Sequence, residues 1–346
     1  MVFRFDTALE TTHGKRAFLR IEGGVERVAI PGYRQPHTLP EPQGHATTGP
    51  KAAPNTVEQS RKRQKGSRAA GASGQAVSGG RARRKATRPD TTRKGALPDF
   101  TIIGAQKCGT SSLYHLLRRH PNVEPSRRKE IHYFDIHFDK GIGWYKSHFT
   151  SASRGVGRKV ISGESSPYYL FHPHAPKRMA AAVPGVKLIV LLRNPVDRAY
   201  SHYQAAARHQ RESLGFEAAL EAEAERLQGE REKMLADESY VSFEHQHFSY
   251  LAKGIYVDQL LDWSKFFHDD QMLVLKSEDY FERPREVLKP VLDLLDLPEW
   301  EPETWETRNK GSYEQRIDSD TRQRLSRYFA PHNERLYDYL GIDFGW

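Results

Sequence analysis

The stretch Phe100-Thr-Ile-Ile-Gly-Ala-Gln-Lys-Cys-Gly-Thr-Ser-Ser-Leu113 decides the fold of this chain. Its first four residues are apolar or β-branched and predict a short buried strand, and a helical pattern that includes Leu116 and Leu117 follows. Gly104 and Gly109 lie between the two elements. Glycines at this spacing let backbone N–H groups approach anionic oxygens, and the helix N-terminus adds positive potential. The stretch therefore predicts a phosphate-binding loop.

The position of a lysine distinguishes this loop from the loops of nucleotide triphosphatases. In those proteins the lysine follows the second glycine, whereas here Thr110 holds that place and Lys107 precedes Gly109. No apolar strand ends in an aspartate suited to hold magnesium. We therefore expect a donor whose transferred group leaves without Mg²⁺, and we expect no metal site. A glycine-rich turn that binds nothing is the alternative.

Strands and helices alternate from this loop to the C-terminus. We expect further strands at 160–161, 187–192 and 272–275, helices at 174–183, from 195 onward, around 256–267, at 284–296 and at 318–340, and an exposed helix at 216–234. Continuous apolar strands that alternate with amphipathic helices indicate a parallel sheet covered on both faces. The expected fold class is α/β, with a P-loop-like parallel β-sheet flanked by helices.

The first 97 residues differ in composition from the rest of the chain. They carry 19 of the 53 Lys and Arg residues but only 7 of the 44 Asp and Glu residues, whereas residues 98–346 carry 34 basic and 37 acidic side chains. The net charge of +9 therefore comes from the N-terminal region and does not indicate a basic folded domain. We expect a largely disordered basic region over 1–97 and a single domain over 98–346.

Two features of the region 1–97 carry further hypotheses. Residues 16–30 are a candidate for a small hairpin around a Gly-Gly pair. The basic clusters 61–65 and 81–85 are candidates for contact with nucleic acid or an acidic surface, and a solvated tail is the alternative.

Cysteine content and hydropathy limit the expected compartment. Cys108 is the only cysteine, which excludes an intrachain disulfide framework and indicates a reducing compartment. The longest strongly apolar run, Leu188–Leu192, is far shorter than the ~20 residues that a membrane-spanning helix needs, and residues 1–6 show no secretory signal. We expect a cytoplasmic protein without a transmembrane segment.

A second segment with anion-binding potential follows the strand at 187–192. Arg193 lies at the expected strand end, Asn194 is suited to cap a helix, and Pro195 is suited to its first position. Ser201 lies about 9 Å further along that helix. A guanidinium and a hydroxyl can converge on one phosphate from these positions. The alternative is that Arg193 only pairs with Asp197.

These residues carry a resemblance to a known family. Residues 104–113 resemble the 5′-phosphosulfate-binding loop of sulfotransferases that use 3′-phosphoadenosine 5′-phosphosulfate (PAPS), among them the heparan sulfate N- and 3-O-sulfotransferases and their bacterial homologues. Four segments match in the same order, from about residue 100 to the C-terminus. The resemblance implies PAPS as donor and adenosine 3′,5′-bisphosphate (PAP) as product. It implies donor contacts from Lys107, Cys108, Gly109, Thr110, Ser111 and Ser112.

The resemblance also implies a site for the donor's 3′-phosphate. Arg193 and Ser201 match the family's arginine and serine that bind this phosphate. A late segment with Lys310, Gly311 and Ser312 resembles the Lys-Gly loop that closes over it. Many relatives have arginine after that glycine, so Ser312 stays in the expected donor-binding set without a charged role.

Sulfuryl transfer needs a base for the acceptor's proton and cations for the charge on the departing phosphate. The segment 129–135 resembles the family segment beside the sulfuryl group, where a glutamate is the proposed base in 3-O-sulfotransferases. The resemblance therefore implies Glu130 as base, with His132 and Asp135 orienting or tuning it. It also implies that Lys107 stabilises the leaving group.

Glu164 is the competing candidate for the base, because it follows the expected strand at 160–161. Relatives often carry a lysine after this glutamate, whereas this chain has Ser165, so one cationic helper is absent or comes from elsewhere. Either carboxylate could instead only pair with a neighbouring Lys or Arg.

The sequence thus predicts a PAPS-dependent sulfotransferase that transfers a sulfuryl group to a hydroxyl or amine, of a carbohydrate-type acceptor by resemblance, through in-line displacement. A P-loop small-molecule kinase is one alternative, and the displaced lysine counts against it. A non-catalytic protein that binds a nucleotide or nucleic acid is the other.

Overall fold

The computed structural model describes residues 95–150, 159–305 and 317–346. The hairpin expected at 16–30 and the two basic clusters lie outside the described residues. The same holds for the late segment with Lys310, Gly311 and Ser312. Disorder is expected over residues 1–97, of which the structure describes only 95–97, so this expectation stays a prediction.

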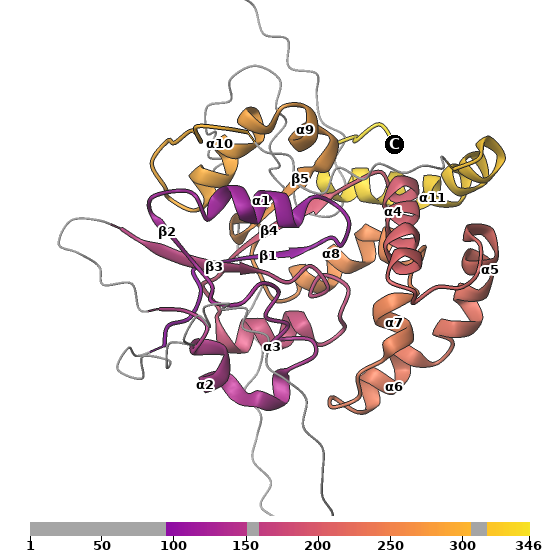
Figure 1. Cartoon of the computed structure of the whole chain (residues 1–346), viewed down its shortest axis with the longest axis horizontal. Coiled ribbons are helices and arrows are strands. Elements are labelled where there is room, and N and C mark those ends of the chain that lie inside the picture. Colours follow the sequence, from indigo (N-terminus) through magenta and orange to yellow (C-terminus); the bar gives the residue numbers. More distant parts are fainter. Residues whose placement is uncertain (1–94, 151–158, 306–316) are drawn as a thin grey trace, which may run out of the picture. The chain divides into compact units, whose positions relative to one another are not determined.

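A five-stranded sheet forms the centre of the described structure (Figure 1). Its strands are β1 (Phe100–Gly104), β2 (Val123–Pro125), β3 (Ile161–Ser165), β4 (Lys187–Leu192) and β5 (Met272–Lys276). They lie in the order β2-β3-β1-β4-β5, and every neighbouring pair is parallel. Strands β1, β3 and β4 are almost completely buried, and apart from Lys187 and Glu164 they consist of apolar or small residues.

Helices cover both faces of this sheet. Figure 1 shows α1, α9 and α10 on one side and α2, α3 and α8 on the other. The helices are α1 (Thr110–Leu117), α2 (Gly141–Lys146), α3 (Ala175–Ala182), α4 (Pro195–Arg208), α5 (Phe216–Leu227), α6 (Glu230–Ala236), α7 (Phe243–His247), α8 (Tyr256–Ser264), α9 (Ser277–Glu282), α10 (Pro284–Leu294) and α11 (Ser319–Leu340). Two buried clusters form the core, one around the sheet and a smaller one between α4, α5 and α11. The expected α/β fold class is confirmed.

The expectation of one exposed helix over 216–234 is wrong. The segment forms two helices, α5 and α6, because Gly229 adopts a left-handed conformation (φ 72°) between them. Helix α5 also buries Phe216 and Leu220 in the smaller core cluster. Strand β2 and helices α2, α7 and α9 were not expected, because elements of three to six residues are too short to show a period.

Candidate functional site

The candidate site segments that the structure describes lie at the carboxyl edge of the parallel sheet. The loop 104–109 follows β1, the segment 129–135 comes after β2, Glu164 lies near the end of β3, and Arg193 follows β4. Ligands of open α/β sheets bind outside this edge, where connections leave a strand in opposite directions. Here β1 has β3 on one side and β4 on the other. The topology therefore brings the candidate residues to one edge.

Hydrogen bonds to β4 and α9 hold the loop after β1. Ala105 N–H donates to the Leu191 carbonyl at 2.8 Å, and Ser277 Oγ donates to the Cys108 carbonyl at 2.8 Å. Gly109 begins α1 with a φ of 89°, and a Cβ atom there would lie 2.8 Å from the Phe281 ring. No side chain caps α1 at Gly109, so no side-chain oxygen takes the place of an anion at this helix start.

Four of the residues expected to contact the donor lie in this loop or in the first turn of α1, and they differ in burial. Thr110 and Ser112 are buried in the first turn of α1, and Ser111 is half-buried. The Cys108 thiol is buried, 3.8 Å from Tyr256 Oη, and burial raises its pKa to about 11. Cys108 is therefore a packing residue of the loop and not a thiolate nucleophile.

Positive charges gather around Lys107. Burial, and then the charges of Arg208, Arg193 and Arg198, lower the pKa of the Lys107 ammonium. Lys107 also has a left-handed backbone (φ 73°), which is unusual for a residue with a side chain. Like charges held together at a helix start create a potential that favours an anion with several negative charges.

The segment after β4 has the predicted local structure. Asn194 caps α4, and its side-chain oxygen accepts from the backbone N–H of Val196 at 3.0 Å, with Pro195 next to it in the first turn. Asp197 pairs with Arg322 at 2.5 Å, so the proposed pairing of Arg193 with Asp197 is wrong. The Arg193 guanidinium lies 5.9 Å from the Phe281 ring centre, and Ser201 is buried on α4.

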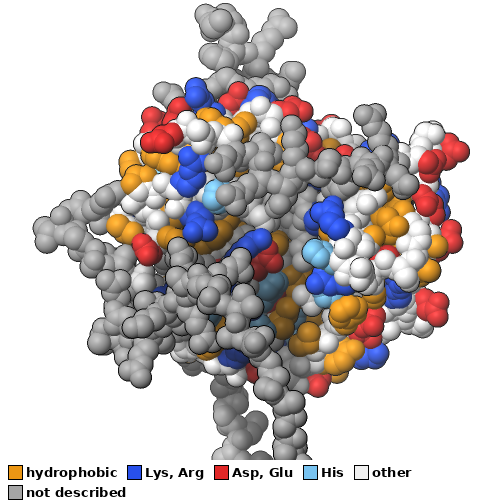
Figure 2. Space-filling model, viewed as in Figure 1, with side chains coloured by type: hydrophobic (Ala, Val, Ile, Leu, Met, Phe, Trp, Pro, Cys, Tyr) orange, Lys and Arg blue, Asp and Glu red, His pale blue; other side chains and the backbone are white. Residues whose placement is uncertain are grey.

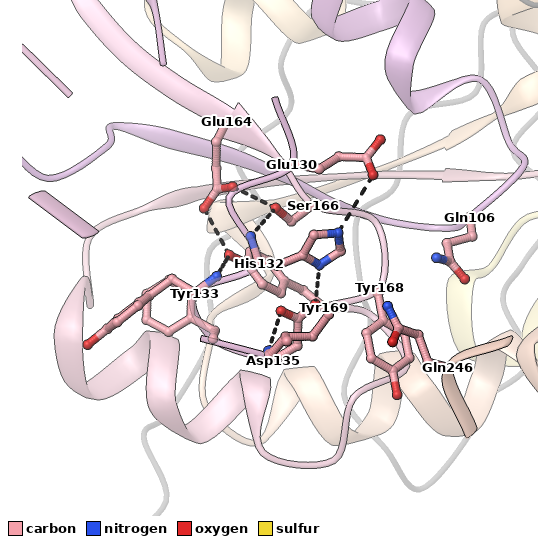
Figure 3. A network of polar contacts seen from close by, with 12 residues as sticks. Gln106, Glu130, His132, Tyr133, Asp135, Glu164, Ser166, Tyr168, Tyr169 and Gln246 are labelled. Carbon is pink, nitrogen blue, oxygen red and sulfur yellow. Dashed lines mark hydrogen bonds and ion pairs between the residues drawn. The ribbon is translucent and has the colours of Figure 1, made fainter. Parts of the chain in front are cut away.

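Glu130, His132 and Asp135 form one chain of ion pairs (Figure 3). His132 Nε2 lies 3.6 Å from Glu130 Oε2, and His132 Nδ1 lies 2.7 Å from Asp135 Oδ2. Burial lowers the pKa of His132, but hydrogen bonds to Asp135 and Glu130 outweigh burial and raise the pKa to about 10. The same contact with His132 is the main cause that lowers the pKa of Glu130. These ion pairs therefore hold the His132 imidazolium between two carboxylates at neutral pH.

Glu164 lies beneath these three ion-paired residues, to which Ser166 connects it, and it is completely buried. Its carboxylate accepts hydrogen bonds from the hydroxyls of Tyr145 at 2.7 Å, Ser166 at 2.7 Å and Tyr169 at 3.1 Å. Burial raises the pKa of the Glu164 carboxyl. Three hydroxyl donors occupy most of the acceptor positions of one carboxylate.

The hydroxyls around Glu164 also hold the backbone beside the ion pairs. Ser166 Oγ accepts from the His132 N–H at 3.1 Å, and Tyr169 Oη accepts from the Tyr133 N–H at 2.8 Å. Glu130 and His132 both have left-handed backbones, with φ of 51° and 57°. Such conformations cost free energy and persist only when the surroundings fix them. Glu164 thereby supports the backbone of His132 through Ser166.

No three His, Cys, Asp or Glu side chains in the described ranges are grouped as metal ligands would be. Nor does any described helix have both the length and the apolar character needed to cross a bilayer.

A family model described as "Sulfotransferase domain" matches residues 97–325. This chain belongs to the sulfotransferase family. The matched range begins before β1 and ends within α11, so it includes all five strands of the sulfotransferase domain and every described candidate residue.

Curated relatives share this sulfotransferase domain. The membrane-associated sulfotransferase kil1 of Dictyostelium discoideum is 26% identical over 72% of this chain and 66% of its own length. The human heparan sulfate glucosamine 3-O-sulfotransferase 3B1 is 30% identical over 72% of this chain and 65% of its own length. The chain thus spans about two thirds of the length of these relatives.

A solved sulfotransferase structure has the same fold. The crystal structure of a sulfotransferase from Alicyclobacillus acidocaldarius is 30% identical to this chain. It superposes with a TM-score of 0.55 over 72% of this chain and 98% of the other. The resemblance to heparan sulfate sulfotransferases and bacterial homologues is therefore confirmed.

Proposed function

We propose that this sulfotransferase transfers the sulfuryl group of PAPS to a hydroxyl or amine of a carbohydrate-type acceptor. The observation that carries the proposal is the uncapped start of α1 with Lys107, surrounded by the charges of Arg193, Arg198 and Arg208. A donor with phosphates at both the 5′ and 3′ positions needs cations in two places. Lys107 in the loop and Arg193 after β4 supply them.

We assign Glu130 as the base. Its side chain is 36% exposed, and its lowered pKa keeps the carboxylate ionised at neutral pH. Glu164 is 0% exposed, and its oxygens already accept three hydroxyl hydrogen bonds. A general base must reach the proton that it removes, so accessibility favours Glu130.

The expected step is one in-line displacement at sulfur. Glu130 takes the proton of the acceptor hydroxyl while the acceptor oxygen forms a bond to sulfur. The bond between sulfur and the bridging oxygen of the donor breaks, and its electron pair stays on the departing 5′-phosphate. Lys107 stabilises that charge by donating to the bridging oxygen. His132 and Asp135 keep the Glu130 carboxylate oriented during the transfer.

Two observations support a carbohydrate-type acceptor. One relative is named for its action on the glucosamine of heparan sulfate. In this chain the three residues that precede the base, Arg127, Arg128 and Lys129, are exposed. On the face shown in Figure 2, Lys and Arg side chains lie on both sides of a hollow in which acidic and histidine side chains are visible. Exposed cations beside the hollow attract an acidic saccharide chain.

A transfer assay with labelled PAPS tests this function. We expect label in saccharides that carry free hydroxyls or amines, with stronger labelling of acidic than of neutral chains. Labelling falls at least about 100-fold when Glu130 is replaced by Gln. Phenols and lipids are the comparison acceptors. Label in phenols or lipids but in no saccharide would contradict the acceptor class, and no transfer to any acceptor would contradict the enzyme assignment.

The kinase alternative makes a different prediction about nucleotides. Membership of the sulfotransferase family counts against it, as does the position of Lys107 before Gly109. A kinase would bind ATP with Mg²⁺ and transfer its γ-phosphate, whereas the proposed enzyme binds PAP without metal. The non-catalytic alternative predicts nucleotide binding with no transfer.

A further inference from the structure

A buried lysine that none of the proposed chemistry uses lies next to the donor loop. Lys253 is in a short 3₁₀ turn, η2 (Ala252–Gly254), just before α8, and its exposed fraction is 3%. Burial, and then the charge of Arg198, lower the pKa of Lys253 well below its usual range. Lysine is rarely buried in this way without a partner, because removing an ammonium from water is costly.

The partners of this ammonium are carbonyl oxygens and aromatic rings. Lys253 Nζ donates to Gln106 Oε1 at 2.8 Å and to the Gln246 carbonyl at 2.5 Å. It also lies 4.9 Å from the ring centre of Tyr168 and 5.5 Å from that of Phe171. In the part of the chain that the structure describes, no Asp or Glu forms an ion pair with it. The Lys253 head group is therefore held by carbonyl oxygens and aromatic rings and not by a carboxylate.

The turn that carries Lys253 is rigidly held. The backbone N–H groups of Leu251 and Ala252 donate to the buried Glu223 carboxylate at 2.7 and 2.9 Å. The Lys253 carbonyl accepts from Gln259 Nε2 at 3.0 Å. A Cβ atom at Gly254 would lie 2.7 Å from the Phe329 ring, so the turn is also closely packed. Lys253 thus extends from a fixed base to the loop.

On the loop side, the contact is made by Gln106, the residue before Lys107. The Gln106 side chain lies near Gln246 and Tyr168 (Figure 3). The next residue, Lys107, has a left-handed backbone with a φ of 73°. A hydrogen bond that fixes Gln106 therefore fixes the peptide from which this unusual conformation starts.

We propose that Lys253 is a positioning residue for the sulfuryl donor: through Gln106 it holds the backbone of residues 105–107 in the conformation that presents Lys107 to the phosphosulfate group. The proposal deepens the proposed function and rests on it. Because the Lys253 head group is fixed and buried, its hydrogen bond to Gln106 is in place before the donor arrives and requires no rearrangement on binding.

The test uses Lys253→Met, which keeps the volume and removes both hydrogen bonds. We expect the KM for PAPS and the Kd for PAP to rise about tenfold, because the buried hydrogen bond that holds Gln106 is lost. We expect kcat to fall because Lys107 is misplaced, while the KM for the acceptor stays unchanged. Lys265→Met is the matched control, because Lys265 is an exposed lysine that pairs with Asp262 and, among the described residues, makes no hydrogen bond or ion pair with the donor loop. A structural defect alone would lower the fraction of active enzyme, and it would not raise the KM for PAPS while leaving the KM for the acceptor unchanged.

Gln106→Met tests the same contact from the loop and keeps the test valid if Lys253→Met does not fold. We expect the KM for PAPS and the Kd for PAP of Gln106→Met to rise as they do in Lys253→Met. We expect these two values in the double variant to rise no further than in the more impaired single variant. Wild-type donor parameters in either folded single variant, or additive losses in the double variant, would overturn the proposal and leave the sulfotransferase function intact. Failure of the wild-type protein to bind PAP would overturn both.

Discussion

The hydroxyl of Ser166 accepts a hydrogen bond from the backbone N–H of His132 at 3.1 Å. The same hydroxyl donates to the buried carboxylate of Glu164 at 2.7 Å. The two glutamates that competed for the role of base in the sequence thus occupy successive layers. Glu130 lies at the accessible end of the His132–Asp135 ion pairs, and Glu164 holds the backbone that carries them.

Replacing Glu130 by Gln removes the proposed base and leaves the donor loop intact. We expect kcat to fall about 10²–10⁴-fold, the usual contribution of a general base. The Kd for PAP stays within about twofold, because Glu130 is not a proposed donor contact. Steady-state kinetics and calorimetry on the same preparation measure both quantities. Unchanged kcat in Glu130→Gln would reject the assignment.

Replacing Glu164 by Ala lowers the stability of the folded protein. Three buried hydroxyl groups lose their acceptor, so we expect the free energy of unfolding to fall by about 3 kcal/mol. Glu130→Ala is the matched control and costs less than about 1 kcal/mol, because Glu130 is partly solvated. Urea denaturation monitored by circular dichroism gives both values. Equal losses in the two variants would contradict the layered arrangement.

The raised pKa of His132 predicts how stability depends on pH. The folded-state pKa is about 10 against an ordinary 6.5, so the stabilisation is fully present below pH 6.5 and is lost as the pH rises through 10. We expect His132→Gln to be less stable than the wild type by about 2 kcal/mol at pH 6 and by much less at pH 10. His209→Gln, at an exposed histidine, is the control. A stability difference that grows with pH would have the wrong sign.

Arg193→Met tests the 3′-phosphate site. We expect the Kd for PAP to rise at least about tenfold, because one charge-assisted contact is lost. Binding of adenosine 5′-phosphosulfate, which lacks the 3′-phosphate, stays unchanged. Arg322→Met is a matched control, because Arg322 of α11 pairs with Asp197 of α4 and is not a proposed donor contact. If both ligands lose affinity equally in Arg193→Met, Arg193 does not act on the 3′-phosphate.

The sequence predicts the elements whose pattern is local. Strand β4 has the expected bounds, because it contains the continuous apolar run Leu188–Leu192, all of which is buried. The Asn194 cap and the loop before α1 are also local, since neighbouring residues define them. In contrast, the break between α5 and α6 depends on one left-handed glycine within a strong helical pattern.

Contacts between distant residues were not predictable in this way. Tyr145 reaches Glu164 from a six-residue helix, and Lys253 reaches Gln106 across 147 positions. Neither pair has a sequence spacing that marks it, because the topology of the sheet brings the partners together. The only signal near Glu164 was the hydroxyl-rich run 165–169, in which Ser166 and Tyr169 prove to donate to the carboxylate.

Calorimetric titration of the wild-type protein with PAP, in the presence of a metal chelator, tests the central claim most directly. We predict binding of one PAP at micromolar concentration or tighter, weaker binding of ATP with or without Mg²⁺, and loss of PAP binding in Lys107→Met. Absence of PAP binding at micromolar concentration, or tighter binding of Mg²⁺-ATP than of PAP, would contradict a PAPS-dependent sulfotransferase.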